Sequence, residues 1–238
     1  MAKVLVFRPS FDLATKYGNS WLGEIGDIAK NIGHNVLDIT GAECTPQAFY
    51  DAMNNFQPDL IITVGHGNEN NFSCQDRELV LTGCTNDQIM AGKQGFYLSC
   101  LVGQELLPSM VKKGAVSVLG FTSEFVWLIN PDYLDNIPND PYAKSFKDAV
   151  VESCRKLLSG STWQQVYEGG VALFDKGIAN WFESEDPMAG EIVAALTQDR
   201  DSMVVYGEKF IGPSGQVLGD VGGLISIPIG LLLLALGL

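Results

Sequence analysis

The chain has 238 residues, 46% of them hydrophobic, which suffices for one full domain or for one domain with a short appendage. Its formal net charge of −13 at pH 7 argues against a nucleic-acid partner, because no basic stripe is available to neutralise phosphates. The same charge disfavours electrostatic docking on an anionic lipid surface.

Cysteine usage argues against metal and disulfide chemistry. The five cysteines are odd in number and irregularly spaced, and no Cys-x-x-Cys pair occurs, which argues against a zinc site and a disulfide framework. No acidic loop has the ligand spacing of a calcium site, so we expect no metal and no cofactor. The first eight residues do not resemble a signal peptide, and we expect a cytoplasmic catalytic part. The cysteines are Cys44, Cys74, Cys84, Cys100 and Cys154.

Strand and helix patterns alternate through the first half of the chain. Thr45 and Pro46 form a helix start, with an N-cap residue followed by proline at the first helical position. Gly33 and Pro58 mark the ends of two helical patterns. The predicted strands cover residues 2–7, 34–39 and 60–64, and the predicted helices cover residues 15–32 and 46–56.

The second half adds strands, helices and two long loops. A polar loop with a short hairpin is predicted over residues 68–83, and a long aromatic surface loop over residues 121–139. The alternation as a whole predicts an α/β fold, a three-layer sandwich with a mainly parallel sheet flanked by helices. The further strands cover residues 95–99, 115–119 and 202–206, and the further helices 103–113, 141–158, 162–181 and 187–196.

The sequence divides into a main domain over residues 1–210, a Gly-rich linker over 211–223 and an apolar C-terminal tail over 224–238. As a helix, the apolar stretch from residue 221 would be about 27 Å long, close to the ~30 Å hydrocarbon core of a bilayer. It therefore suggests membrane association. Pro228 and the lack of a following Lys or Arg weaken that interpretation, and a segment packed on the domain is the alternative.

Two chemically distinctive residues follow successive apolar strands. His66 lies between two glycines after the strand over 60–64, and Cys100 follows the strand over 95–99. In an open parallel sheet, ligand-binding and catalytic residues are usually found at the carboxyl ends of the strands. A cysteine nucleophile needs a nearby imidazole and backbone donors for an oxyanion, which the N–H groups of Gly67 and Cys100 could supply. Taken singly, each of the two residues is more often structural.

The two motifs in this order resemble the caspase–hemoglobinase fold of cysteine peptidases, most closely the gingipain-like and CHAT-like branch. The resemblance covers roughly residues 1–210. It rests on a strand ending in His-Gly (61–67), a strand ending in Ser-Cys (95–100), a following Gly-Ala strand (113–120) and a degenerate closing Gly-Asp-Pro motif (203–208). It implies that Cys100 is the nucleophile, His66 the general base or acid, and the Gly67 and Cys100 N–H groups the oxyanion donors.

The resemblance also implies strict selection of P1, the residue before the scissile bond. The matching pocket regions of this sequence hold Arg8, Asp76, Glu124 and Trp127. Two acids against one base favour a basic P1 residue. The expected partner is a protein or peptide substrate, and the two long loops are where self-cleavage is plausible.

Two alternatives from other classes remain open. The chain could be a non-catalytic caspase-like module that binds a partner at a membrane. It could also be a flavodoxin-like ligand-binding protein in which Cys100 and His66 are incidental. Thiol alkylation would change nothing in that last case, and a phosphate-bearing small molecule would stabilise the fold.

Overall fold

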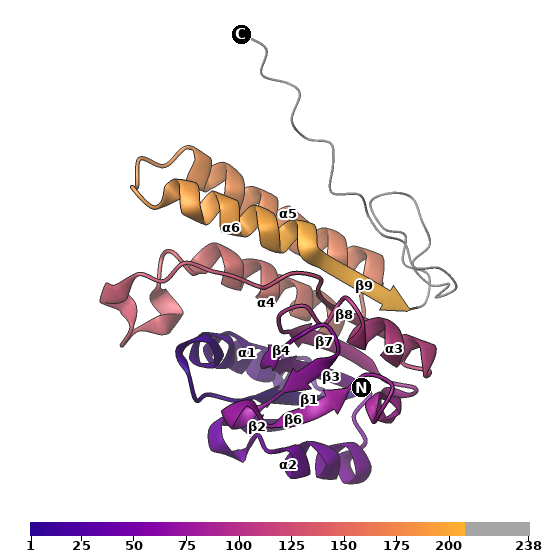
Figure 1. Cartoon of the computed structure of the whole chain (residues 1–238). Coiled ribbons are helices and arrows are strands. Elements are labelled where there is room, and N and C mark those ends of the chain that lie inside the picture. The colour runs from indigo at the N-terminus through magenta and orange to yellow at the C-terminus, as the bar shows by residue number, and fades with distance from the viewer. Residues whose placement is uncertain (208–238) are drawn as a thin grey trace.

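A computed structural model describes residues 1–207, which form an α/β domain around a six-stranded sheet (Figure 1). The strand order is β2-β1-β3-β7-β8-β9, and all neighbours are parallel except the edge pair β8 and β9. The predicted linker and apolar tail lie outside the described residues. The strands are β1 (Lys3–Arg8), β2 (Asn35–Thr40), β3 (Leu60–Val64), β7 (Gln94–Leu98), β8 (Ser117–Phe121) and β9 (Met203–Gly207).

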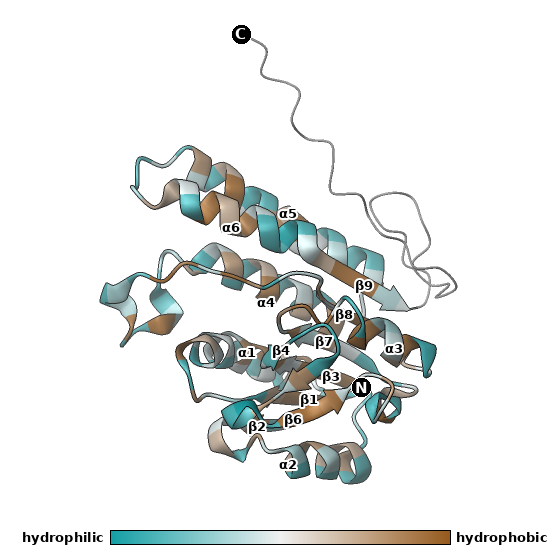
Figure 2. Cartoon of the chain, viewed as in Figure 1, coloured by the Kyte–Doolittle hydropathy of each residue, from teal (hydrophilic) through white to brown (hydrophobic). Residues whose placement is uncertain are grey.

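Helices cover both faces of the sheet, which confirms the predicted three-layer sandwich. Val4 and Val6 of β1 face one apolar core with the large helices, and Leu5 and Phe7 face a second core with the small helices, as the period of a strand requires. Figure 2 shows the apolar strands between more polar outer helix surfaces. The first face carries α1 (Leu13–Ile32), α4 (Lys144–Leu158), α5 (Trp163–Phe182) and α6 (Ala189–Ser202); the second carries α2 (Pro46–Asp51) and α3 (Leu106–Lys112).

Capping residues set the helix ends close to the predicted boundaries. The Thr45 side chain accepts a hydrogen bond from the Ala48 N–H at the start of α2, as its sequence position indicated. At the start of α1, Asp12 and Thr15 form a capping box that the sequence analysis did not single out. Gly33 ends α1 in the left-handed conformation, with φ 97°. Helix α3 begins at Leu106, three residues later than predicted, because the preceding residues form the turn after Cys100.

The polar loop with a short hairpin predicted over residues 68–83 contains two strands of a small antiparallel sheet. This sheet consists of β4 (His66–Gly67), β5 (Asn71–Ser73) and β6 (Leu79–Thr82). Phe72 and Val80 are fully buried in the core of the α2 and α3 face, which explains why this stretch is ordered. The remaining short elements are a π-helical turn, Ala52–Phe56, and 3-10 turns at Gly41–Glu43, Gln75–Arg77, Asp87–Met90, Pro131–Tyr133 and Ile137–Asn139.

The segment after β8, predicted as a long surface loop, is partly a core element. Its Phe125 is only 5% exposed and packs edge-on against Phe121 and Trp21. The loop is tied down at its far end by buried Asp140, which accepts hydrogen bonds from the Tyr17 hydroxyl (2.6 Å) and the Asn130 N–H (3.1 Å). The prediction of an exposed loop was wrong there, because aromatic side chains without a helical or strand period can still be buried.

Within residues 1–207, the helices are too short or too polar to cross a bilayer.

We expect Asp140→Ala to lower the free energy of unfolding by about 3 kcal/mol. The substitution removes the acceptor of the Tyr17 hydroxyl and of the Asn130 and Tyr142 N–H groups, leaving polar groups without partners in the interior. Urea unfolding followed by circular dichroism measures the change. Asp135→Ala, at an exposed position of the same loop, is the matched control and should change stability little. Equal stability of the two variants would contradict the anchoring role.

Candidate active site

The pairing of β3 with β7 places His66 beside Cys100. Val64 lies opposite Leu98 in the parallel register, and His66 and Cys100 each stand two residues beyond that pair. The Gly65 N–H continues the ladder by donating to the Leu98 carbonyl at 3.2 Å. Because neighbouring strands are about 4.8 Å apart, residues at matching positions after the two strands lie next to each other where the chain leaves the sheet.

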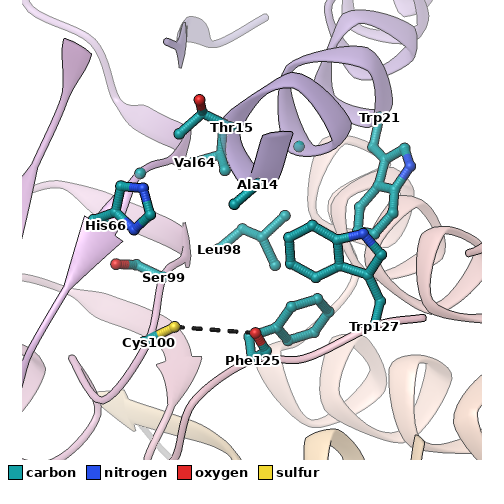
Figure 3. A pocket seen from close by; sticks show the side chains of 12 residues that line it. Ala14, Thr15, Trp21, Val64, His66, Leu98, Ser99, Cys100, Phe125 and Trp127 are labelled. Carbon is teal, nitrogen blue, oxygen red and sulfur yellow. Dashed lines mark hydrogen bonds between the residues drawn. The ribbon is translucent and has the colours of Figure 1, made fainter. Parts of the chain in front are cut away.

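Both residues line one pocket with a volume of about 80 Å³ (Figure 3). In the close-up, His66 and Cys100 lie on one side with Ser99 between them, and Trp21 and Trp127 lie on the other. The structure therefore brings together the imidazole and the thiol that the sequence motifs singled out.

A carboxylate holds the histidine. The Nε2 atom of His66 lies 2.6 Å from Oδ2 of Asp12, and the ring packs edge-on against Phe11 with centroids 5.6 Å apart. Asp12 was not among the predicted site residues. The signal that could have found it is the capping pattern of Asp12 and Thr15, which fixes this carboxylate at the end of the turn after β1.

The same carboxylate caps α1 with its other oxygen. Oδ1 of Asp12 accepts hydrogen bonds from the Thr15 N–H (2.9 Å) and hydroxyl (2.8 Å). Burial acts to raise the pKa of Asp12, but the bonds from Thr15 and His66 outweigh it and lower the pKa below its ordinary value. Asp12 is thus a stable anion beside the imidazole at neutral pH.

Cys100 stands at a sharp turn between β7 and α3. The next residue, Leu101, has φ 62°, a left-handed conformation that is costly for a branched side chain. Hydrogen bonds to the end of β8 and to the loop after it hold this turn: the Leu101 N–H donates to the Ser123 carbonyl and the Gly103 N–H to the Phe121 carbonyl. The turn ends the strand abruptly and leaves the Cys100 side chain at the pocket.

Burial raises the pKa of the Cys100 thiol above its ordinary value, and the negative charge of Glu124 acts in the same direction. The sulfur lies 4.0 Å from the Phe125 carbonyl, which can accept the weak thiol hydrogen bond. The site therefore holds a neutral thiol rather than a preformed thiolate.

Gly67 closes the gap between the two strand ends. A Cβ atom at this position would lie 2.4 Å from Oγ of Ser99 and 2.7 Å from the carbonyl oxygen of Cys100. Only glycine allows the backbone to approach the cysteine this closely. The turn that follows is fixed to α3, since the Glu69 carbonyl accepts hydrogen bonds from the Glu105 and Leu106 N–H groups.

The other predicted pocket residues differ in their placement. Trp127 lines the pocket, whereas Arg8, Asp76 and Glu124 do not. Arg8 is bound on both sides of its guanidinium, by the Asp38 carboxylate at 2.8 and 2.9 Å and by the Asn19 side chain at 2.9 Å. Asp76 and Glu124 are exposed.

Among residues 1–207, no cluster of three or more His, Cys, Asp or Glu side chains could hold a metal ion.

We expect Gly67→Ala to lower the free energy of unfolding by about 1–3 kcal/mol, the usual cost of overpacking. The added methyl would meet the Cys100 carbonyl oxygen, a backbone atom that cannot rotate away, together with the side chains of Ser99 and Val102. Thermal and urea unfolding measure the effect. Gly190→Ala is the matched control, because a Cβ there meets nothing within 4 Å and alanine favours the helix. A Gly67→Ala protein as stable as the control would show that the strand ends are not in close contact.

We expect the rate of Cys100 alkylation by iodoacetamide to rise with pH, with a midpoint above that of an ordinary cysteine. The thiolate is the reacting species, and burial and the nearby Glu124 carboxylate disfavour it. The measurement uses a Cys84→Ser protein, which removes the exposed cysteine, with mass spectrometry to assign the modified site. The same protein with Cys100→Ala is the control and should stay unmodified, since the other three thiols are buried. A midpoint below neutral pH would reveal a preformed thiolate–imidazolium pair instead.

Comparison with known proteins gives matches at the level of structure only. No protein-family model matches the sequence, and no curated protein is similar to it. The structure of the Arg-specific cysteine proteinase gingipain R superposes with a TM-score of 0.56 at 14% identity, over 90% of this chain and 47% of that one. A complex of the RgpB pro- and mature domains from Porphyromonas gingivalis gives a TM-score of 0.54 at 14% identity, over 87% and 47% of the two chains.

A secreted C11 cysteine protease from Bacteroides thetaiotaomicron, iotapain, matches with a TM-score of 0.45 at 10% identity, over 73% of this chain and 61% of that one. The chain spans about half the length of the gingipain structures it matches. At these identities the likeness concerns the fold, and the structural neighbours are cysteine proteases. The chain has the caspase–hemoglobinase fold that its two strand-end motifs indicated.

Proposed function

We propose that this chain is a cysteine endopeptidase in which Cys100 is the nucleophile and His66 the general base and acid. The observation that carries the proposal is the register of β3 and β7, which sets both residues at matching positions around one pocket. The fold supports it, because the solved structures it resembles are cysteine proteases. The substrate is accordingly a protein or a peptide.

In the first step, His66 accepts the Cys100 thiol proton as Sγ attacks the carbonyl carbon of the scissile bond. The raised pKa of the thiol favours proton transfer at the moment of attack over a resting thiolate. The carbonyl oxygen becomes an oxyanion, for which the backbone N–H groups of Gly67 and Cys100 are the proposed donors. The absence of a side chain at residue 67 supports this role, since the backbone there already approaches Cys100 closely.

In the second step, His66 donates the proton to the leaving amine, the C–N bond breaks, and a thioester on Cys100 remains. Water then attacks the thioester while His66 accepts one of its protons. The products are a new carboxyl terminus and the regenerated thiol, so no oxidant, reductant or metal is consumed.

Asp12 is the proposed positioning residue for this cycle. Its Oδ2 lies 2.6 Å from Nε2 of His66, so it fixes the ring and stabilises the imidazolium formed in each half of the reaction. The bonds to Thr15 hold the carboxylate in place from the other side.

The alternatives rank behind this proposal. A non-catalytic caspase-like module would need neither the shared pocket nor the Asp12 contact, and the fold comparison gives a flavodoxin-like interpretation no support. A cytoplasmic location remains a prediction. Membrane association through residues 224–238 also remains one, since these residues lie outside those that the structure describes.

The test is cleavage of a fluorogenic peptide library, varied at P1, by the full chain. We expect one P1 class to dominate, Cys100→Ala to abolish turnover, and His66→Ala to lower kcat by roughly 10²–10⁴-fold, the usual contribution of general acid–base catalysis. Asp12→Ser should lower kcat by about 10–10³-fold with little change in KM, because it loses the histidine contact. Serine is an equally good N-cap, so this variant should keep the stability of α1.

The Cys84→Ser protein is the matched control for loss of a thiol outside the pocket and should keep full activity. Peptide cleavage that survives Cys100→Ala would overturn the proposal. So would the absence of both cleavage and covalent capture of Cys100 by a peptidyl electrophile across the whole library.

A further inference from the structure

The pocket beside the thiol is apolar in its walls. On the side away from His66 and Cys100 it is lined by Ala14 and Gly18 of α1, Leu98 of β7, and the rings of Trp21, Phe125 and Trp127. Figure 3 shows the two indoles and the Phe125 ring gathered opposite the imidazole, with Leu98 in between. The aromatic rings pack on one another, with the Trp21 and Trp127 centroids 5.5 Å apart, so they hold each other in place as one wall of the pocket.

No free carboxylate lines this pocket. Of its lining residues, only His66 and Cys100 carry an ionisable group. The nearby acids do not point a free carboxylate into the pocket: Asp12 binds His66 and Thr15, and Asp199 accepts the Val126 N–H at 3.0 Å. Glu124 is exposed and lies outside the pocket lining. A cationic side chain entering the pocket would lose its hydration without gaining an ion pair, which is a large cost.

The volume limits the size of the side chain. A cavity of about 150 Å³ is known to hold benzene, so a pocket of about 80 Å³ suits an aliphatic group smaller than an aromatic ring. A second, more open apolar depression of about 220 Å³ adjoins it and shares Ala14, Phe125 and Trp127. Leu13, Val126 and Ile129 complete the lining of this depression, so the apolar surface continues beyond the pocket.

We propose that the pocket binds the aliphatic side chain, of alanine to leucine size, that precedes the scissile bond, and that the substrate is an apolar stretch of polypeptide. The inference rests on the proposed peptidase function and names its substrate class. It replaces the basic P1 residue expected from Asp76 and Glu124, because neither acid lines the pocket. The occupant of the adjoining depression is a second apolar side chain of the same peptide.

The position of the depression beside the proposed catalytic pair supports a side chain of the substrate peptide as its occupant. The depression shares Ala14, Phe125 and Trp127 with the pocket that holds Cys100. The formal net charge of −13 further disfavours an acidic peptide.

Binding without chemistry is measured on the full chain carrying Cys100→Ala. The probes are peptides identical except at the residue before the scissile bond, which is Ala, Val, Leu, Phe, Arg or Glu. Calorimetry gives affinities, and the fluorescence of Trp21 and Trp127 reports entry into the pocket. We expect the Val and Leu peptides to bind at least about 10-fold more tightly than the Arg and Glu peptides, with the Phe peptide weaker than Leu.

Substitutions at Ala14 change the pocket without disturbing its frame. Ala14→Asp places a carboxylate in the first turn of α1, where an acid is favourable for the helix, and should shift the preference from Leu toward Arg. Ala14→Leu should fill the pocket and shift the preference toward Ala. Lys16→Asp is the matched control: it adds an acid to the same turn outside the pocket lining and should leave the preference unchanged.

Each outcome decides between the two proposals. Tight binding of Val or Leu peptides without cleavage by the unmodified chain would support the pocket inference and overturn the peptidase. Cleavage after Arg or Glu would keep the peptidase and overturn the pocket inference. The pocket inference also fails if all peptides bind equally or none binds, or if the apolar depression instead mediates dimerisation that peptides do not reverse.

Discussion

The in-register pairing of β3 with β7 is the constraint on which the candidate site depends. Both strands are buried, and their apolar side chains alternate between the two cores, so a slip by one residue would turn each side chain to the wrong face. The register that buries Ile62 and Phe96 in one core is therefore the register that sets His66 beside Cys100. The geometry of the candidate site is thus a consequence of core packing. The glycines on both sides of His66 let other backbone segments approach closely, since a Cβ would lie 2.2 Å from the Ser73 carbonyl oxygen at Gly65 and 2.7 Å from the Cys100 carbonyl oxygen at Gly67.

A single carboxylate then links the helix layer to this sheet edge. Asp12 uses one oxygen to cap α1 and the other to hold His66, so the position of α1 and the orientation of the imidazole are set together. Helix α1 also supplies one wall of the pocket. The wall, the histidine and the helix start are thus a coupled unit, and substitutions at Asp12 must be chosen to separate capping from positioning.

Much of the sheet could be predicted from the sequence, because apolar strands and strand-end residues have a local signal. The alternation of strands and helices predicted the three-layer sandwich, and the motifs around His66 and Cys100 singled out two residues that line the same pocket. The pocket could not be predicted in the same way. Arg8 is the last residue of β1, but its guanidinium is paired with Asp38. No local pattern shows that Phe125 folds inward or that Asp12 reaches His66.

The pocket wall formed by the segment after β8 has its own anchoring, which explains how an irregular segment can hold a fixed position. Helix α6 holds the loop after β8 at two adjacent residues: Gln198 donates to the Glu124 carbonyl, and Asp199 accepts the Val126 N–H. Burial raises the pKa of Asp199 to about 9, so at neutral pH this contact is made by a neutral carboxyl group. An ionised Asp199 would place an uncompensated charge behind Phe125. The neutral form lets α6 fix the loop while the pocket in front of it stays apolar.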